Sequence, residues 1–430
     1  MTERVTTFGA ELRRMRMEAG LSLAQLGELL HYSKGHLSKI ENGTKSPSPE
    51  LARQSDAALG AKGRLVSLVA GRPSDTAPPE AVSDEDEVWL MSLSADGANW
   101  FNPVNRREAL ALTTSSLLGF GLSSQGMSAT ARRPAAVEVF RTMFEQARNL
   151  GQTASPGVVL PAAIAQTHVL RGLALKAPPG IRDEFLVLGA RFAEYAGWMA
   201  QEAGNSQAAL WWTAKAVDMA AAGNDHDLAV YSLVRRALVT LYRDDAAQTI
   251  ELARQAQVRK DVPRRIRGLA AQREAQGHAL AGDYDACMRL LDEARELLAG
   301  DSDRPDPSVL GSMNLTDPVS MATGWCLYEL GRPKEAAEIL DAQVALIRPQ
   351  ALRSQARYGA RQALAHASAG HVEHACDLTG RLLTISDVVA SATITTDLRR
   401  LARVLSRWHA NPSVRELYPA LTAALRSPEV

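Results

Sequence analysis

The stretch Ser22–Gly43, SLAQLGELLHYSKGHLSKIENG, decides the fold of the N-terminal part of the chain. Ser22 and Gln25 form the S-x-x-Q pattern that caps the first turn of a helix, and leucines follow at helical spacing. Ser33 is placed to cap a second helix, and Gly43 is placed to end it. The stretch therefore predicts two short helices joined by a tight turn, a helix-turn-helix.

The second of these helices carries short, polar and cationic side chains on its outer face. Taken alone, such a face is ordinary solvated helix surface. Within a helix-turn-helix, the same side chains suit entry into the major groove of DNA, where they reach base edges. The residues that we assign to base contacts are Lys34, Gly35, His36, Ser38 and Lys39.

Composition and charge place the chain among water-soluble globular proteins. It has 430 residues, of which 46% are hydrophobic, and a net charge of zero. Nucleic-acid binding must then come from a local patch. Residues 1–70 hold ten Lys/Arg against seven Asp/Glu, whereas residues 71–88 hold one Arg against six acids. The modest basic excess therefore lies on the helix-turn-helix segment.

Several classes of protein are excluded by what the sequence lacks. The three cysteines, Cys287, Cys326 and Cys376, are far apart, which argues against a disulfide framework and against a zinc site. The sequence shows neither a run of eighteen apolar residues nor a signal peptide. We therefore expect a cytoplasmic protein that does not associate with membranes.

Catalytic and metal-binding patterns are also missing. Histidines are scattered, no glycine-rich phosphate loop occurs, and His371 and His374 have no evident third ligand. We predict no enzyme activity, no metal and no cofactor.

From residue 134 onward the sequence becomes a succession of Ala-rich amphipathic segments. Turn markers at Gly204, Arg243, Gly282, Gly331 and Gly370 are separated by 39, 39, 49 and 39 residues. Small residues recur at fixed distances on both sides of most markers, as the close crossing of paired helices requires. These residues are Gly197, Ala275, Gly324 and Ala363 before the markers, and Ala209, Cys287, Ala336 and Ala375 after them. The pattern predicts a solenoid of helical hairpins.

Residues 8–70 resemble the XRE family, the lambda-repressor-like DNA-binding domains. The motifs that carry the resemblance are L-S-x-x-x-L, S-K-I-E-N-G and P-S-P-E-L-A. The chain departs from the family pattern at Leu23, where a Gln is common, and at His31, where Gly is usual.

The resemblance implies roles for individual residues of the N-terminal segment. Positions matching Lys34, Gly35, Ser38 and Lys39 face the bases in that family, and Arg16 is expected to pair with Glu41. Positions matching Ser22, Asn42, Thr44 and Lys45 lie near phosphates.

Residues 180–410 resemble the tetratricopeptide (TPR) family, most clearly in the run Gly282-Asp283-Tyr284-Asp285. The repeat period is longer than in that family, so TPR-like describes the segment better. The family register places the first helix of each hairpin on the concave side, where aromatics beside carboxamides suit a peptide or a flat small molecule. The expected effector groove comprises Trp198, Gln201, Gln272, Gln276, Met321, Trp325 and Tyr328, although the tryptophans equally suit simple packing of the array.

The predicted organisation is an all-α chain of three parts. A five-helix DNA-binding domain occupies residues 1–70, an acidic, proline-containing linker with a short helical connector occupies 71–133, and a TPR-like sensor and dimerisation domain occupies 134–430. Within the connector we expect a helix from about Arg106 to Leu118. The resemblance as a whole is to XRE-family transcriptional regulators of the actinobacterial type, with double-stranded DNA, a second copy of the chain, and a peptide or small-molecule effector as partners. The alternative is a protein-interaction adaptor whose solenoid binds a partner protein and whose DNA binding is secondary.

Overall fold

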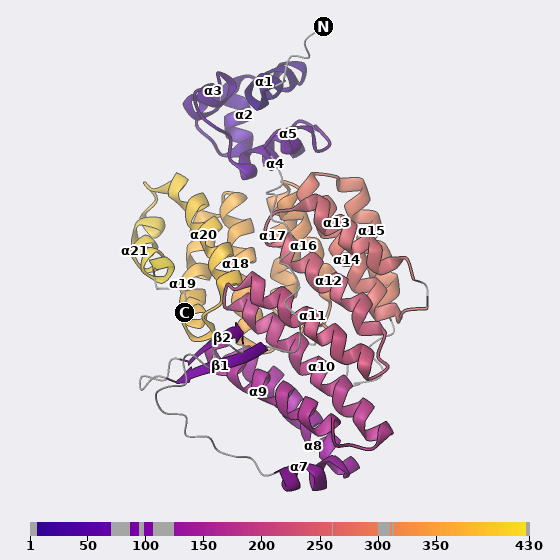
Figure 1. The fold of residues 1–430 in the computed structure, drawn as a ribbon. Helices are drawn as coiled ribbons and strands as arrows, with labels where there is room; N and C mark the ends of the chain where they lie inside the picture. The colour runs from indigo at the N-terminus through magenta and orange to yellow at the C-terminus, as the bar shows by residue number, and fades with distance from the viewer. Residues whose placement is uncertain are drawn as a thin grey trace.

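The computed structural model describes residues 7–69, 124–259, 261–299, 310–311 and 314–426, with side chains from 128 onward in the second range, and the backbone of two strands at 87–93 and 99–105. A small helical domain is followed by a long array of antiparallel helices (Figure 1). The predicted all-α architecture is confirmed, with the two strands as an addition.

The N-terminal domain consists of five short helices around one small core. They are α1 (Phe8–Glu18), α2 (Leu23–Leu30), α3 (Lys34–Glu41), α4 (Pro49–Ala58) and α5 (Arg64–Ser67). Leucines from all five helices meet in the core, among them Leu12, Leu26, Leu37, Leu51 and Leu65, each fully buried. The predicted count of helices is confirmed.

Side chains cap the starts of α2, α3 and α4, the first two as the sequence predicts. Ser22 and Gln25 make both hydrogen bonds of a capping box at the start of α2. The hydroxyl of Ser33 accepts from the His36 N–H at α3, and that of Ser48 accepts from the Leu51 N–H at α4. These local bonds satisfy helix-end N–H groups and fix where each helix begins.

The connector contains an antiparallel strand pair that the sequence analysis did not anticipate. Strand β1 (Glu87–Leu93) pairs with β2 (Asn99–Asn105), with Leu90 opposite Asn102. Strand β1 contains Val88 and Trp89, and β2 contains Trp100, Phe101 and Val104, residue types that favour extended backbone. Helix α7 (Ser124–Ala131) follows. The helix expected at residues 106–118 lies outside the described residues.

The rest of the chain is a series of helical hairpins. They are α8 (Pro134–Thr153) with α9 (Pro156–Ala174), α10 (Pro179–Glu202) with α11 (Ser206–Ala222), α12 (Asp227–Leu241) with α13 (Ala246–Gln257), α14 (Arg264–Ala281) with α15 (Tyr284–Leu298), α16 (Pro318–Glu329) with α17 (Pro333–Val344), α18 (Leu352–Ser368) with α19 (Val372–Val389), and α20 (Ala392–Leu405) with α21 (Pro412–Arg426). All five predicted turn markers lie in the loops within hairpins, so the repeat prediction is confirmed. No helix in the described parts of the chain is long and apolar enough to cross a membrane.

Small residues allow the paired helices to approach closely, as predicted. A Cβ atom on Gly197 would lie 3.1 Å from the carbonyl oxygen of Ala209 on the neighbouring helix. A Cβ on Gly324 would lie 2.7 Å from Leu340. Cys287 is fully buried between helices, which confirms that it is a small core residue.

The array curves until its later helices meet its first ones. Helix α18 lies against α8, and α20 lies against α10 (Figure 1). Arg353 of α18 joins these helices, and its side chain is only 2% exposed. The guanidinium donates to the carbonyls of Gly151 at 2.6 Å, Ala154 at 2.6 Å and Val389 at 3.0 Å, and to Glu202 Oε2 at 2.9 Å. One side chain therefore holds three segments distant in sequence.

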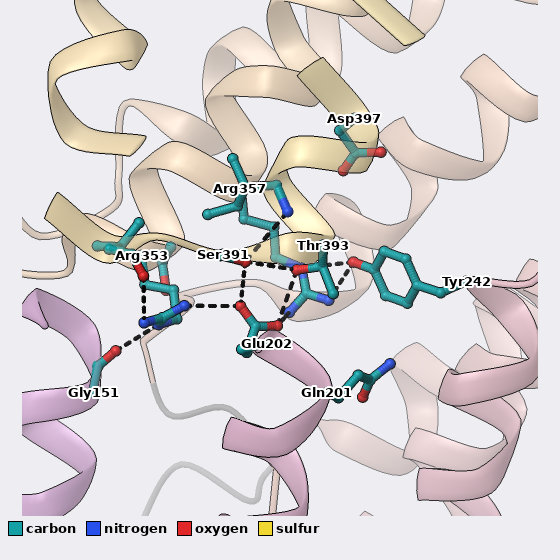
Figure 2. A network of polar contacts seen from close by, with 12 residues as sticks. Gly151, Gln201, Glu202, Tyr242, Arg353, Arg357, Ser391, Thr393 and Asp397 are labelled. Carbon is teal, nitrogen blue, oxygen red and sulfur yellow. Dashed lines mark hydrogen bonds and ion pairs between the residues drawn. The ribbon is translucent and has the colours of Figure 1, made fainter. Parts of the chain in front are cut away.

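Glu202, at the end of α10, is the anionic centre of this network (Figure 2). Its carboxylate also accepts from the hydroxyls of Ser391 at 2.6 Å and Thr393 at 3.0 Å, at the start of α20. Burial alone would raise the pKa of Glu202, but Arg357 and Arg353 hold it below its ordinary value. The group is therefore ionised, and its charge is fully hydrogen-bonded. We call Glu202, Arg353, Ser391 and Thr393 the closure network.

The closure network predicts a large effect of a small change. Replacing Glu202→Gln leaves Arg353 buried without its counter-charge, and should lower the free energy of unfolding by roughly 3–5 kcal/mol. Urea denaturation followed by circular dichroism measures this effect. The control is Glu335→Gln, which removes an exposed pair with Arg332 and should cost less than about 1 kcal/mol. Equal effects of the two substitutions would contradict the role of the network.

Candidate nucleic-acid interface and ligand cavity

Helix α3 presents its polar face to solvent because its apolar face is anchored. Leu37 and Ile40 are buried in the N-terminal core, which fixes the rotation of the helix about its axis. The residues predicted to contact bases then lie on the outer side: Lys34, Gly35 and Lys39 are exposed, and His36 and Ser38 are half-buried. The structure therefore places all five on one accessible helix.

An internal ion pair braces α3 against α1. The Arg16 guanidinium donates to both carboxylate oxygens of Glu41, at 2.6 and 2.9 Å, and to the carbonyl of Leu21 at 2.8 Å. This pair was expected from the family resemblance, and the structure confirms it. A bidentate, partly buried pair at the end of α3 limits rocking of the helix.

The residues predicted to lie near phosphates fall in two places. Asn42, Thr44 and Lys45 follow the end of α3, where the Thr44 hydroxyl donates to the carbonyl of Lys39 at 3.0 Å. Ser22 lies instead at the N-terminus of α2, a position whose N–H groups and dipole suit a phosphate. The two places flank the base-contact residues along the chain.

The N-terminal domain docks on the hairpins through α4. Arg53 pairs with the fully buried Glu329 of α16 at 3.1 Å. Glu50 accepts from the Ser368 hydroxyl at 3.1 Å and pairs with Arg407, which follows α20 in the short 3₁₀ helix η2 (Ser406–Trp408). Figure 1 shows α4 on the side of the domain that faces the hairpins.

His31 explains why this chain departs from the family pattern in the turn. It adopts φ of +56°, the left-handed conformation that usually favours glycine. Its ring lies 5.9 Å from the Trp408 ring, and a Cβ on Gly370 would lie 3.1 Å from it. The backbone strain at His31 is therefore offset by contacts that glycine cannot make.

A cavity of about 320 Å³ lies on the inner side of the curved array. Its walls come from α8, α10, α12, α14 and α18, so that first helices of the hairpins line it, as the TPR-like register predicts. The aromatic lining residues are Phe144, Tyr195, Trp198, Tyr231 and Tyr358. The cationic ones are Arg148, Arg191, Arg235, Arg273, Arg348, Arg353 and Arg357, against two glutamates, Glu145 and Glu194.

The residues predicted for the effector groove are not all brought together. Trp198 lines the cavity, and two carboxamides support its arginines: Gln201 accepts from Arg235 at 3.3 Å, and Gln276 accepts from Arg273. Gln272 is buried, and its Oε1 has no hydrogen-bond partner.

The remaining three groove residues lie elsewhere. Met321 and Tyr328 are in the hydrophobic core of the later hairpins, at 1% and 8% exposure. Trp325 is 5% exposed and lines a second, much smaller cavity beside Tyr242 and Arg361.

The arginines are what the sequence analysis missed. The available signal was their spacing: Arg353, Arg357 and Arg361 recur every four residues on the first helix of a hairpin, and so share one face of α18. The predicted groove consisted instead of aromatic, carboxamide and methionine side chains, all of which are neutral.

A polar cluster at the α17–α19 end also differs from expectation. The sequence showed no third metal ligand near His371 and His374. In the structure, donor atoms of Asp341, His366 and His374 lie within 4.8 Å of one another. His366 Nε2 is 2.9 Å from Asp341 Oδ1, a distance that an ordinary hydrogen bond explains.

Comparison with known proteins supports the identity of the N-terminal domain. Residues 7–69 match the model of a helix-turn-helix domain family. None of the curated proteins compared matches the chain. The N-terminal domain is thus an XRE-like helix-turn-helix domain.

One solved structure is similar to part of the chain. It is the crystal structure of a putative kinesin light chain with nearly identical TPR-like repeats from Podosopora anserina, with a TM-score of 0.32 and 19% identity over 47% of this chain and 100% of that one. At such low similarity, the TPR-like character of the hairpins rests on their own geometry.

The docked position of His31 predicts how its imidazole titrates. Burial, Lys334, Arg407 and His371 all disfavour its charged form and lower its pKa below the ordinary value of about 6.5. The docked state therefore favours the neutral ring, and docking weakens as the pH falls below about 6.5 because the undocked ring takes up its proton first. NMR titration of the His31 ring, assigned by loss of its signal in His31→Asn, should show the lowered pKa.

The same titration has an internal control. Arg407→Met removes one neighbouring cation and should raise the pKa of His31, whereas Arg289→Met, on the distant helix α15, should not. A His31 pKa at or above 6.5 in the unmodified protein would show that the ring does not lie at the domain interface.

Proposed function

We propose that the protein is a sequence-specific DNA-binding transcriptional regulator of the cytoplasm, in which the TPR-like hairpins pair two copies and respond to an effector. The observation that carries this proposal is the recognition helix α3, braced by Arg16 and Glu41, with Lys34 and Lys39 exposed on its outer face. We assign DNA binding to residues 1–70 and the sensing and pairing functions to residues 134–430.

The requirement for two copies follows from the size of the DNA-binding domain. A single short recognition helix reaches few bases, and tight operator binding by this motif takes two domains about 34–36 Å apart along the duplex. The N-terminal domain has a small core and docks on the hairpins through α4. If the hairpins hold two copies together, they set the distance between the two N-terminal domains, and this distance determines the affinity for the operator.

Helix α20 is the proposed link between effector and DNA. Its first turn bonds Glu202 of the closure network through Ser391 and Thr393. Further along, Arg400 pairs with Glu329 at 2.8 Å, and Glu329 also pairs with Arg53 of the DNA-binding domain. An effector that favours one position of α20 would change how that domain is held, and hence the binding equilibrium.

Both sets of predicted DNA contacts can be tested by substitution. Genomic fragments selected by the purified protein and footprinted should reveal a reproducible site. Lys45→Ala should then weaken binding to all sequences alike and reduce the salt dependence, as the slope of log K against log salt, by about one. Lys34→Ala should cost roughly 1–3 kcal/mol and change base preference.

Lys62→Ala provides the matched control, because Lys62 is exposed in the same domain but lies in the loop before α5. It should leave both affinity and salt slope unchanged. If no reproducible site is recovered at moderate salt, the proposal is wrong and the adaptor function is favoured.

A further inference from the structure

We propose that the cavity is a binding site for a small ligand that carries an anionic group, such as a carboxylate, sulfonate or phosphate, on a flat aromatic body. This inference rests on the proposed function only in naming that ligand as the effector. The binding itself is a property of the hairpins and is independent of DNA.

The arginines around the cavity exceed the carboxylates that balance them. Within the described parts of the chain, Arg191 pairs with Asp225 at 2.9 Å, Arg235 with Glu194 at 3.0 Å, and Arg353 with Glu202 at 2.9 Å. Arg357 has only the same Glu202, at 4.0 Å, and bonds chiefly to the Tyr242 hydroxyl. The cavity is therefore strongly cationic.

Arg273 of α14 is the residue that points most clearly to an anionic ligand. Among the described residues no carboxylate lies within ion-pair distance, and its one hydrogen bond goes to the neutral carboxamide of Gln276. Its Nε is buried without a hydrogen-bond partner. Burial of the guanidinium lowers its pKa to about 10. The residue as a whole is half-buried at the cavity wall, and a charge desolvated in this way favours a partner of opposite sign.

The walls beside the arginines are suited to a flat body. Phe144, Tyr195 and Trp198 form a contacting series of rings, with centroids 6.0 Å apart for the first two and 5.5 Å for the last two. Arg353 already lies 5.9 Å from the Trp198 ring, so cationic and aromatic groups alternate on the lining. The combination recognises an anion and a π-face together.

The size of the cavity favours a small molecule over a protein segment. At about 320 Å³ it lies at the lower end of the range for small-ligand sites, roughly 300–1,000 Å³. Between α8 and α18, the closure network bounds the cavity. A compact ligand fits this space better than an extended peptide.

The test uses the full-length protein and two fluorescent probes. 1-Anilinonaphthalene-8-sulfonate is an aromatic anion with a planar naphthalene ring, and N-phenyl-1-naphthylamine has the same rings without the sulfonate. The sulfonate should bind with one-to-one stoichiometry and much more tightly than the neutral probe. Arg273→Met should weaken sulfonate binding at least about tenfold and leave binding of the neutral probe unchanged or stronger.

A control variant and a second measurement complete the test. Arg289→Met changes an exposed arginine outside the cavity and should not alter binding. Inorganic pyrophosphate should raise the melting temperature of the unmodified protein but not that of Arg273→Met. Without ligand, Arg273→Met should melt at or above the unmodified protein, because it removes a partly desolvated charge that has no carboxylate partner among the described residues.

The outcomes separate this proposal from the proposed function. Equal binding of both probes, unchanged sulfonate binding in Arg273→Met, or neither sulfonate binding nor a pyrophosphate shift would each overturn the cavity assignment. A lower melting temperature for ligand-free Arg273→Met would do so as well, by showing that the guanidinium is structural. Failure to find an operator would contradict the proposed function but would not affect the conclusion that the cavity binds an anionic ligand.

Discussion

The buried ion pair between Arg353 and Glu202 is the interaction on which the rest of the structure depends. In a row of helical hairpins each repeat contacts only its neighbours, so these contacts alone do not join the first hairpins to the later ones. Here one guanidinium bonds carbonyls at the C-terminal ends of α8 and α19 as well as the carboxylate that ends α10, so the first and later hairpins are fixed together. The same bonds define a cavity and place α20.

Helix α20 contacts the closure network, whose Arg353 lines the cavity, and also the residues that hold the N-terminal domain. At its start, Ser391 and Thr393 complete the hydrogen bonding of Glu202. Further along, Arg400 pairs with Glu329, which also pairs with Arg53 of α4, and Arg407, in η2 directly after α20, pairs with Glu50 of α4. Movement at the cavity and movement at the DNA-binding domain therefore share one rigid element, which is the physical basis of the proposed switch.

Much of this architecture could be predicted from local sequence. Ser22, Ser33 and Ser48 fix helix starts through bonds within three residues, and turn glycines such as Gly282 mark hairpins by period alone. The closure network could not be predicted, since Arg353 and Glu202 are 151 residues apart and each resembles an ordinary surface charge in the sequence. The predicted effector groove was correct for Trp198, which lines the cavity. It wrongly included Met321 and Tyr328, because the sequence does not show that their helix, α16, is buried on nearly all sides.

The central claim is that the closure network and the docking of the DNA-binding domain are coupled through α20. Hydrogen exchange in the unmodified protein and in Glu202→Gln tests it most directly, because Glu202 does not belong to the docking surface. The account predicts faster exchange in α20 and in α4 as well as at the end of α10. Faster exchange confined to α10 and α18, with α4 unchanged, would contradict it.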